Sequence, residues 1–394
     1  MAGYFAAVRH WNPAQIGLIL AAQKIASVAT QMPAGYLIDQ TIYKKQLMAA
    51  VASIISLGSV FIVWMPSVFW QVVNQAAVGV STATATPLLA ALSLGLVGRA
   101  AFARRISRNS ALSHAGNMLT AAGAGYLGYR SGQQWIFYIS ALLGLACTVS
   151  ALLIRSGDID HQVAREAPEN HQASHTAPTS LLSLLQDPTV LMFALAVVLF
   201  HAANSAMLPL AGEELSASNQ KSASLYLLVC IVLPQLIMIP VALATGRAAE
   251  RIGRKPVLVG AFCALVLRGA LFALARNPFY IVAVEGLDGI GTGIAGVATT
   301  LVVADLARGT GRFNALGGMI QACLGIGAFL GNLLAGMAAK RFGFPPAFLG
   351  LAAVAFMGLL VFGLTVPETL SGHGGDARLE ASKNRASRWG QKEK

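Results

Sequence analysis

Long apolar runs separated by short polar connections make up most of the chain. A helix that crosses a bilayer needs about 20 mostly apolar residues, because each residue adds about 1.5 Å along the helix axis. The pattern therefore predicts an all-α integral membrane protein with eleven transmembrane helices. The expected spans are 16–36, 47–66, 68–92, 110–129, 135–154, 189–210, 223–244, 257–275, 279–302, 315–338 and 345–366.

The polar stretches divide these spans into two groups. The longest polar stretch contains Pro168, Pro178 and three histidines, and no Cys or carboxylate geometry favours a metal site there, so we expect a solvated linker. The expected domains are a helix bundle at 1–154, a cytoplasmic linker at 155–188, a second bundle at 189–366 and a basic tail at 367–394.

The composition supports a membrane protein and excludes several other classes. Hydrophobic residues form 56% of the chain and charged residues 11%, whereas soluble proteins have about 25% charged residues. This excludes a soluble enzyme, a disordered chain and a disulfide scaffold. The four cysteines lie in separate apolar runs without a C-x-x-C pair. Without a nucleophile–base pair or a metal-ligand cluster, we expect no enzymatic activity, metal or cofactor.

The placement of the positive charges predicts the orientation in the membrane. The net charge of +12 would suggest nucleic acid as a partner of a soluble protein, but here we expect none. Twenty of the 28 Lys and Arg residues lie in alternate loops and in the C-terminal tail. Because cytoplasmic loops are enriched in Lys and Arg, we expect the C-terminus in the cytoplasm and the protein in a plasma membrane, the inner membrane of a bacterium.

Two pairs of segments repeat at a nearly constant offset. The segment from Gly35 to Lys44 aligns with that from Gly246 to Lys255 at an offset of 211 positions. A second pair aligns Gln75 with Glu285 in the same place in the order of spans. Duplicated halves are a recurrent architecture of secondary transporters.

The second copy of the first pair is similar to a family signature. Its pattern resembles the G-x-L-x-D-R-x-G-R-[RK] loop of the major facilitator superfamily, and the first copy departs from it at Gln40, Ile42 and Tyr43. The resemblance implies two pseudo-symmetric helix bundles, and loops that latch the halves on the cytoplasmic side during the transport cycle. The candidate loop residues are Gly35, Asp39, Lys44, Gly246, Glu250, Arg251, Gly253, Arg254 and Lys255.

The family has twelve helices, one more than the spans counted here. The repeat offset places the partner of 189–210 before Met1, so 1–154 corresponds to family helices 2–6 and 189–366 to helices 7–12. We expect that the sequence is truncated or starts late. A true eleven-helix variant is the alternative.

Charged residues at membrane depth are costly and therefore functional candidates. Glu285 and Asp288 share one helix face, and Arg268 lies on the preceding span at a similar depth. One interpretation is a proton-coupling site in which Arg268 and burial act in opposite directions on a carboxylate. The other is an ion pair that only fixes helix packing.

Polar residues inside the spans are candidates for substrate contact. Each could instead form a buried hydrogen bond between helices. Many family members, especially drug–proton antiporters, carry Arg where this chain has Gln75, so the site departs from that pattern. Lys24 lies deep in its span and could attract an anionic substrate or pair with a carboxylate. The candidate substrate contacts are Asn74, Gln75, His114, Asn117, His201 and Asn204.

The resemblance implies transport of a small solute by alternating access. We expect proton coupling, efflux rather than uptake, and a monomer in the lipid bilayer. A metabolite uptake permease is the alternative, and a truncated, non-transporting sensor is a second one. The G-x-G-x-x-G match at 291–296 lies inside a span, so close helix packing explains it better than nucleotide binding.

Overall fold

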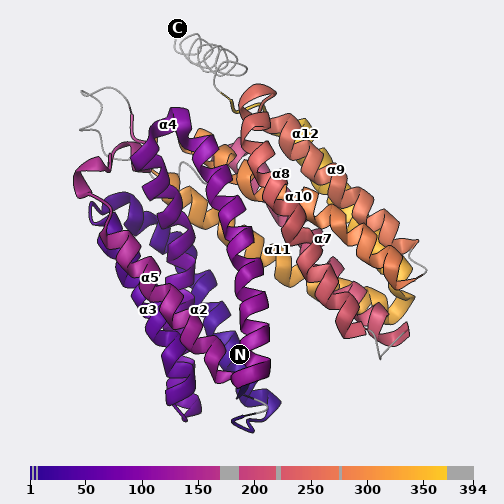
Figure 1. Cartoon of the computed structure of the whole chain (residues 1–394). Coiled ribbons are helices and arrows are strands. Elements are labelled where there is room, and N and C mark those ends of the chain that lie inside the picture. Colours follow the sequence, from indigo (N-terminus) through magenta and orange to yellow (C-terminus); the bar gives the residue numbers. More distant parts are fainter. Residues whose placement is uncertain (2–3, 6–7, 169–185, 219–222, 275–276, 371–394) are drawn as a thin grey trace. The chain divides into compact units, whose positions relative to one another are not determined.

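The part of the chain that the structure describes is almost entirely helical (Figure 1). The computed structural model describes residues 1, 4–5, 8–168, 186–218, 223–274 and 277–370. Within these residues there are ten long α-helices and two short 3-10 helices, and no strand. The α-helices are α2 (Pro13–Gln40), α3 (Lys44–Trp64), α4 (Val68–Ser131), α5 (Gln134–Leu152), α7 (Pro188–Ser218), α8 (Ala223–Arg251), α9 (Arg254–Ala273), α10 (Pro278–Ala307), α11 (Phe313–Phe342) and α12 (Phe344–Thr365).

Each of the eleven expected spans lies within a helix, apart from at most two residues at its C-terminal end, and the all-α membrane fold is confirmed. The spans 68–92 and 110–129 both lie in α4, a segment of 64 residues in which two helices meet at the non-helical residue Gly98. Gly98 has a φ of 70°, a conformation that suits glycine because it has no Cβ. Among the described residues, nine helices are long and apolar enough to cross a membrane. That number counts α4 once and leaves out α2, which polar residues such as Lys24 interrupt.

The chain divides into two compact units. Unit 1 consists of 1–105, 115–181 and 307–325, and unit 2 of 106–114, 182–306 and 326–394. The long helices α4 and α11 therefore each contribute residues to both units. The bundle boundaries at 154 and 189 stay a prediction.

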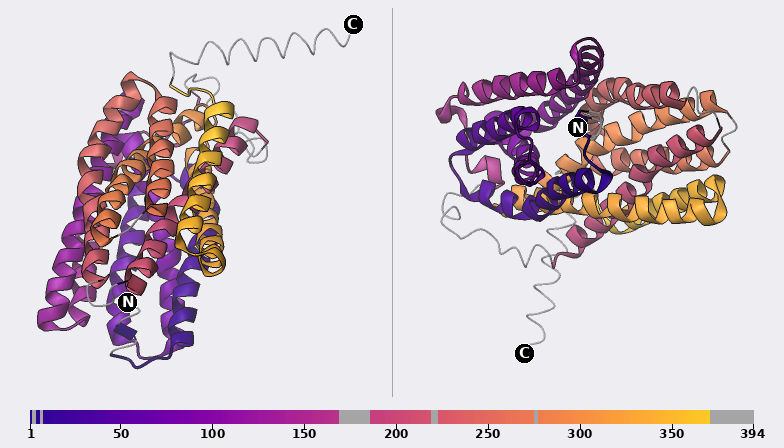
Figure 2. Two further views of the ribbon diagram at one scale, coloured as in Figure 1. Left: turned by 90° about the vertical axis from the view of Figure 1, so that its right-hand side faces the viewer. Right: turned by 90° about the horizontal axis from the view of Figure 1, so that it is seen from below.

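In unit 1, α3 packs along α5 (Figure 2). Small and hydroxylated residues form part of this contact. The Ser56 hydroxyl donates to the Ala141 carbonyl over 2.6 Å, and the Ser53 and Thr148 hydroxyls lie 3.2 Å apart. Hydrogen bonds of this kind join helices in membranes, where the lipid offers no competing partner.

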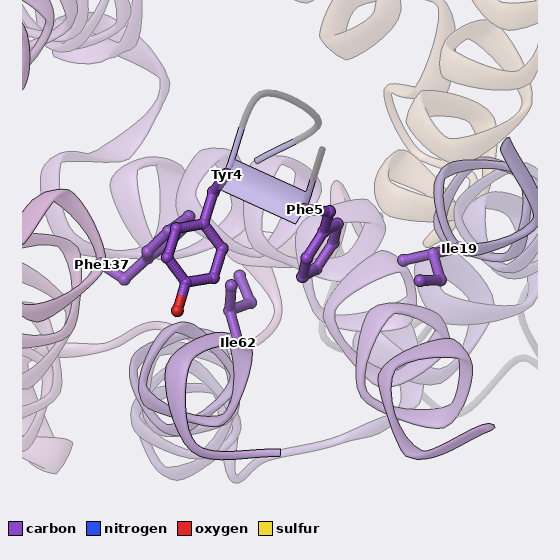
Figure 3. Close-up of a cluster of buried hydrophobic side chains, with 5 residues drawn as sticks. All are labelled: Tyr4, Phe5, Ile19, Ile62 and Phe137. Atoms are coloured by element: carbon purple, nitrogen blue, oxygen red, sulfur yellow. The ribbon is translucent and has the colours of Figure 1, made fainter. Parts of the chain in front are cut away.

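A cluster of buried aromatic and aliphatic side chains lies in unit 1 (Figure 3). Tyr4 and Phe5, from the N-terminal segment, pack on Ile19, Ile62 and Phe137, and Phe5 is fully buried. The rings of Tyr4 and Phe137 meet edge to face with centroids 5.1 Å apart. The cluster therefore holds Tyr4 and Phe5 against α2, α3 and α5.

In unit 2, α12 packs against both α7 and α9. The rings of Phe262 and Phe362 stack with centroids 5.8 Å apart. Gly327 and Gly331 of α11 lie directly against α7, because a Cβ at Gly331 would overlap the Ala202 carbonyl. The 291–296 glycines lie inside α10, where Gly291 approaches α9 and Gly293 approaches α8 closely, as predicted for helix packing, whereas Gly296 meets nothing within 4 Å.

The first part of the expected linker folds onto unit 1. It contains the 3-10 helices η1 (Ser156–Asp158) and η2 (Val163–Arg165), and Ile159 and Ala164 are buried. Residues 169–185 of the linker, with two of its histidines, and residues 371–394 of the expected basic tail lie outside the described residues.

Candidate functional site

Three charged residues meet between α9 and α10 in unit 2. The Arg268 guanidinium donates to both carboxylate oxygens of Glu285, with its Nη2 2.9 Å from Oε1 and 2.8 Å from Oε2. Its Nη1 donates to Oδ1 of Asp288 over 2.8 Å. Arg268 and Glu285 are each 1% exposed, and the Asp288 side chain is 16% exposed. The structure thus brings together the three residues that the sequence proposed for proton coupling.

Two polar residues complete a closed ring of hydrogen bonds with this cluster. Asn204, on α7, accepts from Nη1 of Arg268 over 2.8 Å and donates to the Thr292 hydroxyl over 3.2 Å. Thr292, one turn after Asp288, donates to Oδ1 of Asp288 over 2.9 Å. The ring therefore links α7, α9 and α10.

Glycines on α10 bring this helix close to α8. A Cβ at Gly289 would lie 2.6 Å from Cβ of Ile237, and one at Gly293 would lie 3.0 Å from Val241. Small residues allow such close approach of membrane helices. Because Gly289 follows Asp288 directly, this contact also sets the position of the carboxylates.

The cluster has one more carboxylate than it has cations. In the fully ionised state Arg268 neutralises one of Glu285 and Asp288, and an uncompensated buried charge is costly. The described neighbours that interact electrostatically with the cluster are His201 on α7 and Cys230 on α8. Binding of a proton or of a cation therefore lowers the cost of burying this site.

Two of the candidate substrate contacts in unit 1 lie between helices. Asn74 donates to the Gly58 carbonyl on α3 over 3.0 Å, which is the helix–helix bond that the sequence left as the alternative. Gln75 is 1% exposed, and its Nε2 has no hydrogen-bond partner among the described residues. Lys24 is exposed.

The remaining candidates lie apart from the charged cluster or at its edge. Nδ1 of His114 hydrogen-bonds Oε1 of Gln235 on α8 over 2.8 Å, whereas Asn117, three residues later on α4, is exposed. His201 is half-buried on α7, one turn before Asn204. Of the six candidates, the structure places Asn204 in the ring and His201 beside it.

The predicted loop residue Asp39 holds the start of α11 within unit 1. Its Oδ1 accepts from the backbone N–H of Asn314 over 3.0 Å, and its Oδ2 from that of Ala315 over 2.9 Å. A carboxylate at a helix N-terminus accepts hydrogen bonds from the unpaired N–H groups there, and its negative charge interacts favourably with the helix dipole. Burial raises the pKa of the Asp39 carboxyl, which lies beyond the expected span 16–36, to about 6, although the N–H donors lower it.

Gly35 and Lys44 support this contact from either side of Asp39. A Cβ at Gly35 would overlap the Asn314 carbonyl, so glycine is needed where α2 meets α11. Lys44 is buried, and its ammonium group donates to the Thr41 carbonyl over 2.5 Å. The first copy of the loop motif therefore forms a buried contact between α2 and α11, although its sequence departs from the signature.

The second copy of the motif binds a different partner in unit 2. Glu250, which aligns with Asp39, is exposed, and Glu368 accepts from the backbone N–H groups of Arg254 and Lys255 over 2.8 and 3.0 Å. Gly253 permits this approach, since its φ is 101° and a Cβ there would overlap the Glu368 carboxylate. Glu368, at the end of α12, thus caps the start of α9.

Comparison with known families agrees with the family resemblance that the loop motif indicated. A model of the family described as "Major Facilitator Superfamily" matches residues 1–247 and 205–391. The chain belongs to the Major Facilitator Superfamily. The expected superfamily is thereby confirmed.

Relatives and solved structures within the superfamily support this assignment. An "Uncharacterized MFS-type transporter" of Mycobacterium tuberculosis is 38% identical over 367 residues, which are 93% of this chain and 88% of the relative. The "Multidrug resistance protein MdtG" of Dickeya zeae is 33% identical over 116 residues, 29% of this chain and 28% of that protein.

Two solved superfamily structures share the fold at low identity. The human organic anion transporter MFSD10 has a TM-score of 0.69 at 16% identity and covers 92% of this chain and 88% of its own. The proton:xylose symporter XylE has a TM-score of 0.71 at 14% identity and covers 93% and 90%.

Sequence reasoning about this superfamily member missed several partners in these sites. Asp305 pairs with Nε of Arg254 over 3.1 Å, and Glu166 pairs with Nε of Arg99 over 2.6 Å. Glu166 has a positive φ of 58° and is buried, which a sequence pattern does not reveal. Thr292 was missed because threonine is common in apolar helices, although its spacing of four from Asp288 was a usable signal. The other partners missed are Asn314 and Glu368.

Proposed function

We propose that this superfamily transporter moves a small organic solute by alternating access and exchanges it for protons. The observation that carries the proposal is the buried site in which Arg268 is shared by Glu285 and Asp288. A carboxylate that leaves the guanidinium in one conformation is buried and unpaired, so it takes up a proton there. When it pairs with Arg268 again, it releases the proton.

Efflux is the proposed direction. The support is the name of the MdtG relatives, which are called multidrug resistance proteins. Uptake by symport is the second candidate, supported by the structural neighbour XylE, which is a proton:xylose symporter. In either case we propose a monomer in a plasma membrane, the inner membrane in a bacterium, with its C-terminus in the cytoplasm, as the loop charges favour.

The loop contacts are proposed to bias the transport cycle. Asp39 joins α2 to the start of α11, two helices that the repeat assigns to different bundles. Glu368 holds α9 to the end of α12 in the same manner. Breaking the Asp39 contact is expected to release one conformation without removing the proton site.

The proposal is tested with two dyes of opposite charge. Bacteria that lack their own efflux pumps are loaded with ethidium or fluorescein, and dye loss is followed with and without a proton ionophore. We expect loss of at least one dye to depend on the protein and to stop with the ionophore. Glu285→Gln and Asp288→Asn are compared with Glu250→Gln, which changes an exposed carboxylate outside the site.

The variants separate coupling from transport. Removal of the coupling carboxylate is expected to abolish extrusion against a gradient while dye exchange across proteoliposomes at equal pH remains. If both variants still extrude dye against its gradient, the cluster is structural and the coupling proposal is wrong. If dye moves inward under a proton gradient, uptake replaces efflux.

A further inference from the structure

The two carboxylates of the charged cluster are held differently. Both oxygens of Glu285 lie on Arg268, and Glu285 is 1% exposed. The hydrogen bonds that the described residues give Asp288 both end on its Oδ1, and its side chain is 16% exposed. A proton therefore reaches Asp288 with less disruption than Glu285, whose two oxygens are both occupied by the guanidinium.

Asn204 is bound to both hydrogen-bond donors of Asp288. Nη1 of Arg268 lies 2.8 Å from Oδ1 of Asp288 and 2.8 Å from Oδ1 of Asn204, so the same nitrogen serves both acceptors. The Thr292 hydroxyl donates to Asp288 and accepts from Nδ2 of Asn204. In a hydrogen-bonded network of this kind, a change at one member alters the strength of its neighbours.

We propose that Asn204 is a positioning residue that transmits the protonation of Asp288 to helix α7. The inference rests on the proposed proton coupling of the same site. An ionised Asp288 attracts the Thr292 hydroxyl and shares Nη1 of Arg268. A neutral Asp288 attracts both donors less, so Arg268 binds Asn204 more strongly and the Thr292 hydroxyl is free to turn.

Within the ring, Asn204 is the residue that connects Asp288 to α7. Glu285 lies on the same helix as Asp288 and Arg268 on α9, while Cys230 faces the pair from α8. His201, on α7, interacts electrostatically with Asp288 and is one turn from Asn204. Because α7 also packs on α12 and on the glycines of α11, a shift of α7 is passed on to both helices.

Hydrogen exchange tests the inference with protons as the only ligand. The purified full chain is followed from pH 8 to pH 5, after correction for intrinsic exchange rates, in peptides from α7 around 198–208 and from α10 around 284–293. In the wild type, both are expected to change protection with the same midpoint. In Asn204→Leu, which removes both hydrogen bonds at similar volume, α10 is expected to keep its response and α7 to lose it.

A matched variant excludes a general effect of lost hydrogen bonds. Ser205→Ala changes the next residue of α7 and removes a contact to Asn332 at 3.3 Å, and it is expected to keep the wild-type response in both peptides. Thr292→Val removes one of the two hydrogen bonds that link Asn204 to the cluster. It is expected to reduce the pH response of α7 by about half. It also provides a test if Asn204→Leu does not fold.

Infrared difference spectra distinguish failure of this inference from failure of proton coupling. The carbonyl band of protonated Asp288 is taken as the difference between the pH 8 to pH 5 spectra of the wild type and of Asp288→Asn, which cancels the bands of Asp39 and of other carboxyls. If this band is present and α7 of Asn204→Leu still responds, Asn204 does not transmit the change and the inference is overturned alone. If no band forms, the coupling proposal is wrong and the inference falls with it.

Discussion

The carboxylate of Asp39 caps the helix that begins beside Asn314, although the two residues are 275 positions apart. The backbone N–H and the side-chain amide of Asn314 both donate to Oδ1 of Asp39, over 3.0 and 2.7 Å. Asn314 also donates to the Ala164 carbonyl in the linker, over 3.3 Å. Asp39 and Asn314 together thus join the end of α2, the start of α11 and the linker in unit 1.

Asp39→Asn is expected to destabilise the protein by about 1–2 kcal/mol, the typical value of a lost N-cap, because an amide offers the start of α11 one acceptor oxygen instead of two. The amide group of the variant would also place an N–H against the Ala315 N–H. Thermal unfolding in detergent measures the loss. Glu250→Gln is the matched control, because this aligned residue is exposed and is expected to be neutral. Equal effects of both variants would contradict the cap.

Arg268→Ala is expected to cost about 3–5 kcal/mol, because it leaves Glu285 and Asp288 buried without a cation. Adding Glu285→Gln to this variant removes one of the two charges, so the double variant is expected to be more stable than Arg268→Ala alone. The same unfolding assay measures both. If the double variant instead loses the sum of the two single losses of stability, the charge of Glu285 does not contribute to the cost of removing Arg268.

The helices could be predicted because the backbone N–H and C=O groups of each span must pair with one another in an apolar environment, which a helix achieves. Each span therefore needs a run of about 20 apolar residues, which is visible in the sequence. The two spans 68–92 and 110–129 were predicted, but the form of their connection was not. The intervening polar residues indicate a loop, whereas in the structure they extend the two helices up to a break at Gly98.

The charged cluster could be predicted for a related reason. Arg268, Glu285 and Asp288 stand out because charges inside apolar runs are costly and need partners. The caps could not be predicted in the same way. Asp39 and Glu368 act on helix starts far along the chain, and the position of a helix start in space is set by tertiary packing, which a single sequence does not give.

Gly289→Ala is expected to destabilise unit 2 by about 1–3 kcal/mol, the range for overpacking a well-packed contact. Its Cβ would lie 2.6 Å from Cβ of Ile237, so α8 and α10 have to separate. Gly296→Ala, on the same helix, meets nothing within 4 Å and is expected to be neutral or stabilising by about 0.5–1 kcal/mol. The difference between the two variants in thermal unfolding is the measured quantity.

Glu368→Gln is expected to alter the pH dependence of stability below pH 4.5. Burial would raise the pKa of the Glu368 carboxyl, but the backbone N–H groups of Leu370, Arg254, Lys255 and Thr369 together hold it below its ordinary value of 4.5. Since the folded state favours the ionised form, this contribution to stability is complete above pH 4.5. It is lost as the pH falls through the lowered pKa.

The wild type is therefore expected to be more stable than Glu368→Gln at pH 7, with a difference that shrinks as the pH falls from about 5 to 3. Thermal unfolding of both proteins across that range measures it, with Glu250→Gln as the control that keeps the wild-type profile. The variant removes the charge at the start of α9 but leaves the pair of Arg254 with Asp305 intact. A constant difference from pH 7 to pH 3 would show that the Glu368 cap does not depend on its charge.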